Sequence, residues 1–460
     1  MNRYCAGCFE KQRKIDELQG EVERLKDRLG YLERKEREGY FGSSTPSSKL
    51  PAKANAAKEN QGKRGGAKAG HAGHGRQGFD PSQADRVVRV ESEVGDRCPQ
   101  CGAVLEDKGT ESHWVLDLPP LKAERIFYRL PKQYCPHCRR TYQPQAPGVF
   151  PKSLYGNQLI ATVAAMHYLH GIPLGRICEQ VGIGLGSLLK IFHRLAQWLA
   201  PVVGPLGEQY RLSPVKHADE TGWRNDGQNG HIWLFATEKI SLFLFRETRS
   251  ARVVREVLGI EPLPGTLVVD RYSAYNRAPC ALQYCNAHLL REIEDLEKEF
   301  PQNREVQAFV GTLAPLLATA MNLRSLPIGD AQFYEQAAQV KSQIQEGVHS
   351  PAQHLGIRRI QEIFHKNADR LYRWAEDRQI PADNNLAERD LRFAVIARKV
   401  SFGSQSQAGA QTRGILMTTL HTLRKRVQSE ACTRLKTALD QLAQDSTLDP
   451  YELLFSNDTS

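Results

Sequence analysis

The sequence predicts a multidomain α+β protein, and three patterns along the chain lead to this fold class. A heptad-spaced helix comes first, two cysteine pairs follow, and β-rich segments interleaved with helices occupy the middle. A chain of 460 residues is long enough for about three domains with a sizeable core. We therefore expect several modules joined in series.

Residues 1–40 predict a coiled-coil dimerisation helix. Apolar side chains alternate spacings of three and four along one seam: Ile15, Leu18, Val22, Leu25, Leu29 and Leu32. About three heptads are marginal as an isolated helix, so the seam favours a homodimer or a higher oligomer. The alternative is one amphipathic helix packed on its own domain.

Residues 41–85 predict a basic flexible linker. The segment is rich in Lys, Arg, Gly, Ala and Asn, a composition that cannot bury a core. It either follows DNA phosphates, with the salt dependence that such contacts bring, or is a solvated tether.

Residues 86–150 predict a zinc-binding ribbon. Each of two CPxC turns directs two thiolates at one ion, and together they complete a tetrahedral four-cysteine site for structural Zn²⁺: Cys98, Cys101, Cys135 and Cys138. The intervening 33 residues exceed the usual spacing, and a ribbon strand at Ile126–Leu130 could occupy them. The alternative is four reduced cysteines without a ligand.

Residues 151–205 predict a helix-turn-helix that binds DNA. The expected helices are Leu159–Tyr168, Arg176–Val181 and Ser187–Leu199. A glycine-containing turn joins the last two, and Ser187 is the expected N-cap. Lys190, His193 and Arg194 would then face phosphates or base edges. A plain helical hairpin is the alternative.

The pattern changes to strands within residues 206–300. The expected strands are Val215–Asp219, His231–Ala236, Ser241–Phe245, Leu267–Asp270 and Gln283–Asn286, with a helix at Arg249–Leu258. Three antiparallel strands, a helix and a further strand follow the order of a ribonuclease H-like α/β catalytic core. That order places Asp219 beside Asp270, while alternation along the strand points Glu220 to the opposite face.

A helical insertion is expected at residues 301–380, the last part of the core at 381–425 and a helical tail at 426–460. In the core helix, Glu388 shares one face with Arg392 and Lys399. Asp383 better suits the N-cap, and Asp390 faces away. Two strand carboxylates and Glu388 could converge on two Mg²⁺ (or Mn²⁺) ions, which prefer hard oxygen ligands.

Six ordered motifs resemble the transposases of insertion sequence family sixty-six, a branch of the DDE transposases. They are DETGW at 219–223, VVDRYSAY at 268–275, CNAHLLRE at 285–292, DNNLAERDLR at 383–392, ARKVSFGS at 397–404 and LDPYELL at 448–454. The resemblance runs through most of the chain. It implies that Asp219, Asp270 and Glu388 are the catalytic, metal-binding acids of a bacterial, nucleoid-associated enzyme. Some family members are encoded with helper proteins, and the sequence leaves open whether this chain works with or without such accessory proteins.

Further residues of these motifs are candidates for the site. Arg398 and Lys399, with Arg392, would contact DNA. Trp223 and Arg271 would either contact DNA or pack beside the acids, and His288 would touch the scissile phosphate or one of the carboxylates. His288 could equally be a buried structural histidine, and Trp223 a core residue.

The expected reaction is metal-assisted attack of water on a phosphodiester at the element's end. The freed 3′-OH then attacks target DNA, so no covalent protein intermediate is needed. One alternative is a DNA-binding regulator, or an inactive transposase, without catalysis. Another is a metal-dependent nuclease or resolvase on a similar fold.

Composition limits the partner and the compartment. The chain has 62 Lys and Arg against 52 Asp and Glu, and its net charge of +10 favours an anionic partner such as DNA. We see no apolar run near the roughly 18 residues of a membrane span, and no secretory signal. A cytoplasmic protein without a membrane partner is therefore expected.

Overall fold

The computed structural model describes residues 11–29 except 12, 16 and 27, then residues 82, 87–88, 96–106 and 122–456. The chain divides into two compact units, Ala52–Lys122 and the remainder, and each is described by itself. Apart from residue 82, the predicted linker lies outside the described residues, as does Leu32 of the predicted seam.

The described residues between 11 and 29 are helical, as the sequence predicts. The five apolar side chains of the seam that fall in this helix, from Ile15 to Leu29, are 47–57% exposed. Self-association through this seam stays a prediction, because the structure contains one chain.

Two short strands frame the second cysteine pair. β1 (Gln133–Cys135) and β2 (Arg140–Tyr142) are antiparallel, and the turn between them carries Cys138. The predicted strand at Ile126–Leu130 is wrong, because these residues have no strand pairing and Ile126 and Phe127 are exposed. The hairpin instead forms where the CPxC turn brings its two flanks together.

Four α-helices lie between β2 and the central sheet: α3 (Asn157–Tyr168), α4 (Leu174–Val181), α5 (Leu185–Leu199) and α6 (Val203–Leu212). Gly182 ends α4 in the left-handed conformation, with φ of 68°, which suits glycine. The predicted cap at Ser187 is wrong. Gly184 is the N-cap, and its carbonyl oxygen accepts the N–H groups of Ser187 and Leu188.

The central sheet has five strands in the order β5-β4-β3-β6-β7. They are β3 (Val215–Asn225), β4 (Gln228–Ala236), β5 (Ser241–Arg246), β6 (Thr266–Val269) and β7 (Ala281–Tyr284). The first three are antiparallel neighbours, whereas β6 and β7 run parallel to β3. Helix α7 (Ala251–Leu258) separates β5 from β6, as predicted.

Opposite faces of the sheet carry different helices. The phenol of Tyr210 in α6 packs edge-on against Phe235 of β4, on the face that also receives the 3₁₀ helix η4 (Ser273–Arg277). Helix α14 (Asn385–Ser401) covers the other face of β3.

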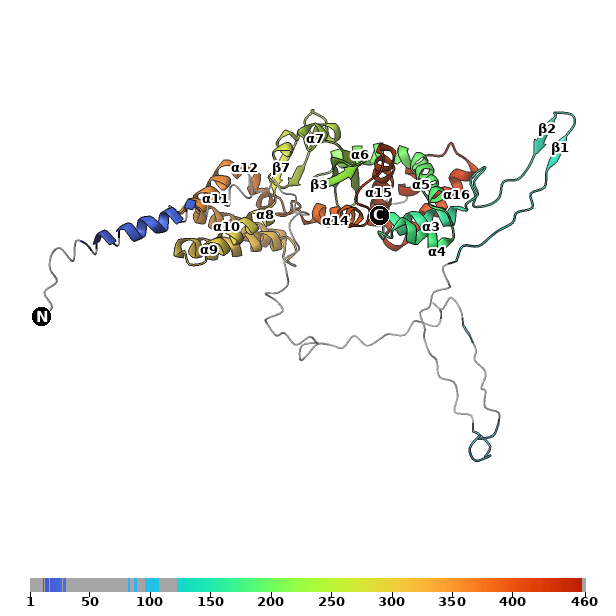
Figure 1. Ribbon diagram of the computed structural model, residues 1–460, viewed down its shortest axis with the longest axis horizontal. Coiled ribbons are helices and arrows are strands. Elements are labelled where there is room, and N and C mark those ends of the chain that lie inside the picture. The colour runs from blue at the N-terminus through green and yellow to red at the C-terminus, as the bar shows by residue number, and fades with distance from the viewer. Residues whose placement is uncertain are drawn as a thin grey trace. The chain divides into compact units, whose positions relative to one another are not determined.

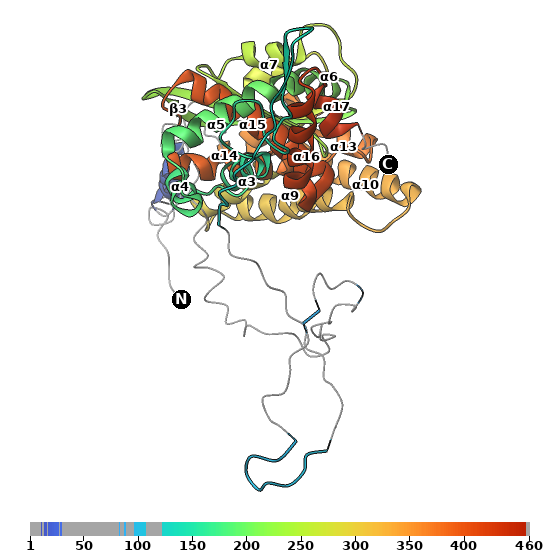
Figure 2. The ribbon, with the colours of Figure 1, turned by 90° about the vertical axis from the view of Figure 1, so that its right-hand side faces the viewer.

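Helix α15 (Gln407–Val427) lies along β5, the outer strand of the sheet. Thr418 Oγ1 accepts the backbone N–H of Phe243 at 2.9 Å, and Thr422 Oγ1 accepts that of Ser241 at 3.0 Å. These bonds satisfy donors that an edge strand would otherwise leave unpaired. Helices α3 and α5 pack on α15, together with α16 (Ala431–Gln444), as Figure 2 shows.

A helical layer flanks the sheet beyond β7. It consists of α8 (Asn286–Glu299), α9 (Arg304–Leu323), α10 (Asp330–His349), α11 (Leu355–Lys366), α12 (Ala368–Leu371) and α13 (Arg373–Glu376). Figure 1 shows α8 to α12 on one side of the sheet and α3 to α5 on the other. The last helix of the described residues is α17 (Pro450–Phe455), capped by Asp449.

Helix α9 departs from the expectation that the chain has no apolar run near the length of a membrane span. By length and composition alone, this helix could cross a membrane. It packs against α8 and α10, however, and buries Val306, Val310, Leu313 and Leu317, as a core helix does.

Candidate active site

Asp219, in strand β3, and Asp270, directly after the neighbouring parallel strand β6, lie close together. His217 of β3 is in register with Val268 of β6. Asp219 comes two residues after His217, and Asp270 comes two residues after Val268. Because side chains alternate, both aspartates share the face of His217. Each is only 7% exposed.

Asp219 is an interior residue of its strand, not the last residue that the sequence predicts. β3 continues to Asn225 because its other edge pairs with β4 as far as the Asn225–Gln228 pair. β6 ends at Val269. The two carboxylates therefore lie where one strand stops and its neighbour continues.

Helix α14 brings Glu388 to the same face of β3. Its N-cap is Asn384, whose Nδ2 donates to the Ala218 carbonyl at 2.8 Å and whose Oδ1 accepts from His217 Nδ1 at 2.9 Å. Glu388 follows in the first turn of the helix. The N-cap thus lies one residue after Asp383, which the sequence predicts. The Asp383 carboxylate nevertheless accepts the N–H of Asn385 at 2.9 Å.

Burial and neighbouring negative charges act on the two aspartates. Burial, followed by the negative charges of Glu220, Asp270 and Glu388, raises the pKa of Asp219 well above its usual value. Burial and Glu220 raise the pKa of Asp270 to about 7, against the N–H of Tyr272 and the cations Arg249 and Arg271. A divalent cation would relieve this repulsion.

One oxygen of the cluster is suited to a metal ion. Asp219 Oδ1 accepts the N–H of Glu220, but Oδ2 is buried and has no hydrogen-bond partner among the residues that the structure describes. A buried, unpaired carboxylate oxygen is costly unless it binds a cation. The residues present therefore fit hard cations such as Mg²⁺.

Glu220 is a further buried acid, and its partners could not be foreseen from the sequence. It points to the opposite face, where Arg249 Nε donates to its Oε1 at 2.7 Å and the Tyr275 hydroxyl donates to Oε2. The position of Glu220 beside Asp219 was the one sign in the sequence that it matters to the site. Its partner Arg249 is 29 positions away, so a local pattern could not identify the pair.

A second group of side chains gathers around Glu388. Arg291 Nη2 lies 3.3 Å from its Oε2, and His288 Nδ1 lies 3.9 Å from its Oε1. Burial and the nearby cations Arg291 and Arg271 lower the pKa of His288 to about 3, so its ring is neutral. Burial and the charge of Glu388 raise the pKa of Cys285 to about 12.

The predicted DNA-contacting cations differ in their exposure. Lys190 and Arg194 are exposed on α5, and Arg392 and Lys399 are exposed on α14. Arg398 instead leans on β3, where it donates to the Thr221 hydroxyl at 3.0 Å and to the Gly222 carbonyl.

His193, which the sequence placed with the DNA-facing residues, is turned inward. Its Nδ1 lies 2.7 Å from the Thr412 hydroxyl of α15, and its ring is half-buried.

Trp223 and Arg271 have structural surroundings. Trp223 is buried, donates to the Ser404 hydroxyl at 3.2 Å and packs edge-on against Phe245. Arg271, which follows Asp270 in the chain, pairs with Glu292 of α8. These contacts fit the alternative that Trp223 is a core residue.

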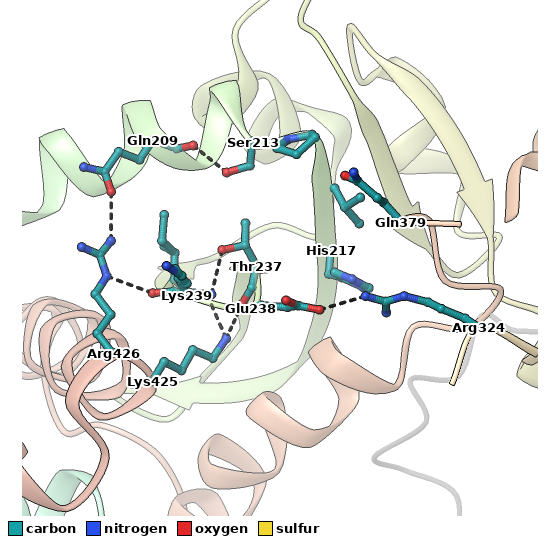
Figure 3. A pocket seen from close by; sticks show the side chains of 13 residues that line it. Gln209, Ser213, His217, Thr237, Glu238, Lys239, Arg324, Gln379, Lys425 and Arg426 are labelled. Carbon is teal, nitrogen blue, oxygen red and sulfur yellow. Dashed lines mark hydrogen bonds and ion pairs between the residues drawn. The ribbon is translucent and has the colours of Figure 1, made fainter. Parts of the chain in front are cut away.

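A separate cavity of about 750 Å³ lies at the start of β3, and none of the three acids lines it. Arg324, Lys425 and Arg426 extend into it (Figure 3). Arg324 pairs with Glu238 at 3.0 Å, and Lys425 Nζ donates to the Thr237 and Ile240 carbonyls. Its cations thus hold the β4–β5 connection in place.

The four ribbon cysteines fall in different compact units, so each pair is described alone. Backbone groups of Gln100 and Cys101 lower the pKa of Cys98, and those of Cys138 and His137 lower the pKa of Cys135. Each turn therefore favours the thiolate form that Zn²⁺ requires.

Comparison with known proteins identifies the family. The family described as "Transposase IS66 family" matches residues 152–412, more than half of the chain, and "zinc-finger binding domain of transposase IS66" matches residues 96–139. Two relatives from Sinorhizobium fredii are both named uncharacterized proteins. y4jD is 24% identical over 75% of this chain and 74% of its own length, and y4qI is 26% identical over 75% and 70%. The chain belongs to the IS66 family of transposases and carries the zinc-finger domain of that family.

Proposed function

We propose that this chain is a DDE transposase that cleaves the ends of its insertion sequence and joins the freed 3′-OH to target DNA. The observation that carries the proposal is the group of carboxylates on one face of β3, two of them buried and one half-buried, where the charges of Asp270 and Glu388 both act on Asp219. Family membership supplies the reaction class.

The strand order supports a ribonuclease H-like core. Three antiparallel strands, a crossover helix and two strands parallel to the first match the order that this proposal requires. In such a core the first and fourth strands are neighbours, which explains why acids 51 residues apart in the numbering, at 219 and 270, can act together.

The roles of the residues follow from their chemistry. Asp219, Asp270 and Glu388 would hold two Mg²⁺ (or Mn²⁺) ions, which activate water and stabilise the attacking and leaving oxygens when bound. Asn384 fixes the start of α14 through Ala218 and so holds Glu388 over the strand. Arg392 and Lys399 are exposed farther along the same helix, where they would contact DNA phosphates.

Other parts of the chain would recognise and assemble. We assign structural Zn²⁺ to Cys98, Cys101, Cys135 and Cys138, and DNA contacts to Lys190 and Arg194 of α5. The exposed seam of residues 11–29 supports dimerisation. Such an enzyme would work at the bacterial nucleoid in the cytoplasm, with or without accessory proteins.

A strand-transfer assay with labelled ends of the element tests the proposal. The wild type should cleave and join only with Mg²⁺ or Mn²⁺. Asp219→Asn and Glu388→Gln should bind the ends but lose both steps. Asp226→Asn on the exposed β3–β4 turn and Glu297→Gln on α8 are matched controls that should retain them.

The alternatives predict other outcomes in the same assay. End binding without cleavage by the wild type would favour a DNA-binding regulator or an inactive transposase. Cleavage without joining would favour a nuclease. Full strand transfer by Asp219→Asn protein would refute the assigned chemistry.

A further inference from the structure

Two side chains that the proposed reaction does not use, Cys285 and His288, form a group with the acid Glu388. The Sγ of Cys285, a ring nitrogen of His288 and a carboxylate oxygen of Glu388 all lie within 4.8 Å of one another. Cys285 is fully buried, and Nδ1 of His288 is buried without a hydrogen-bond partner in the described part of the chain. A buried, unpaired ring nitrogen is available to a ligand.

We propose that Cys285, His288 and Glu388 bind one zinc-class divalent cation. Sulfur is a soft ligand that Mg²⁺ does not favour, whereas Zn²⁺ and Co²⁺ accept thiolate, imidazole and carboxylate together. Three protein ligands leave a fourth position for water, as in open zinc sites.

Rigid elements set the spacing of the three ligands. Cys285 is the N-cap of α8 and His288 lies in its first turn, so one helical turn presents both, while Glu388 lies in the first turn of α14. Two ligand atoms on a tetrahedral zinc ion are roughly 3.4 Å apart. His288 Nδ1 and Glu388 Oε1 are 3.9 Å apart and the three ligand atoms all lie within 4.8 Å, so binding would draw the ligands together by at most about 1.4 Å.

Neighbouring groups fit a metal-bound thiolate. The backbone N–H of Asn384 donates to Cys285 Sγ at 3.2 Å, a bond of the kind that orients metal ligands. Binding would release the thiol proton to solvent. Arg291 now contacts Glu388, and its side chain is 30% exposed, so it has room to turn outward when a cation takes its place.

The site has a consequence for catalysis, which rests on the proposed function. Glu388 would belong to both metal sites, so zinc held by Cys285 and His288 would compete with the Mg²⁺ pair for this carboxylate. Zinc would then inhibit cleavage at constant Mg²⁺. The stoichiometry of zinc binding does not depend on that function.

Metal analysis of the purified full-length chain after dialysis against zinc tests the site. The wild type should hold one zinc more than Cys285→Ser and one more than His288→Asn. Cys178→Ser, a cysteine of α4 outside the group, should match the wild type. Two replacements that act at different ligands guard against a folding defect in one, and circular dichroism checks both.

The outcomes separate the two proposals. Equal zinc content in the wild type and both variants would overturn the site. Zinc inhibition of wild-type cleavage that is lost in Cys285→Ser supports the shared Glu388, whereas equal inhibition of both proteins contradicts it. If no protein cleaves DNA, the transposase proposal fails, while the zinc count still decides whether the site exists.

Discussion

Replacing Arg249 by methionine should destabilise the core, because it leaves the Glu220 carboxylate buried without its cation. The Glu220 side chain is 0% exposed and that of Arg249 is 16% exposed. Arg249 also lies over the ring of Tyr272, 3.8 Å from its centroid. The pair is therefore enclosed on the α7 face of β3.

The expected cost follows from the burial. Breaking a buried ion pair by removing one partner costs about 3–5 kcal/mol, since the remaining charge stays desolvated. For a large domain, each kcal/mol lowers the midpoint of thermal unfolding by about 2–4 °C, so a fall of roughly 10 °C is expected. Removing the exposed Arg255 of α7 should change stability by less than about 0.5 kcal/mol.

Thermal unfolding of four proteins measures the coupling: the wild type, Arg249→Met, Glu220→Gln and the double variant. The double variant should recover most of the loss, because the neutral amide has no need of a cation and still accepts from Tyr275. The reasoning is refuted if Arg249→Met is no less stable than Arg255→Met, or if the double variant is as unstable as Arg249→Met.

Three further predictions concern the fold and assembly. Gly403 has φ of 135°, and a Cβ there would lie 2.2 Å from a backbone oxygen, so Gly403→Ala should cost at least about 1–3 kcal/mol in urea unfolding. Gly311→Ala in α9 meets no atom within 4 Å and should add about 1 kcal/mol. Burial lowers the pKa of His421 from 6.5 to about 3, so the unfolded chain binds the extra proton between these values and stability falls as the pH drops below 6.5. His421→Gln should reduce the slope of unfolding free energy against pH by up to about 1.4 kcal/mol per pH unit. An unchanged slope would contradict a lowered pKa of His421. Leu18→Lys with Leu25→Lys should halve the mass seen by light scattering, and an unchanged mass would exclude the seam as the dimer contact.

The positions of most strands along the chain were predictable from local patterns, because alternation and turn residues act within a few positions. The segments at β3, β4, β5 and β6 were all located, although the end of β3 was misplaced by six residues, at Asp219 instead of Asn225. The missed part contains Glu220 and Thr221, which are polar yet buried. Their partners, Arg249 and Arg398, come from distant segments, so local polarity suggested an exposed turn.

The start of α14 illustrates the same limit at the site. A sequence pattern favoured Asp383 as the cap, and its carboxylate does accept the N–H of Asn385. The adjacent Asn384 is fixed by His217 and Ala218, some 166 positions away in the chain. Contacts at that separation depend on the packing of the whole core, which a single sequence does not specify.

The measurement that bears most directly on the central claim is iron-mediated backbone cleavage. Fe²⁺ in place of Mg²⁺, with peroxide, produces radicals that cut the chain close to the ion. Convergence of Asp219, Asp270 and Glu388 predicts cuts near all three residues, suppressed by excess Mg²⁺ and lost together in Asp219→Asn. Cuts confined to one of the three segments, or cuts that Mg²⁺ does not suppress, would contradict a shared metal site.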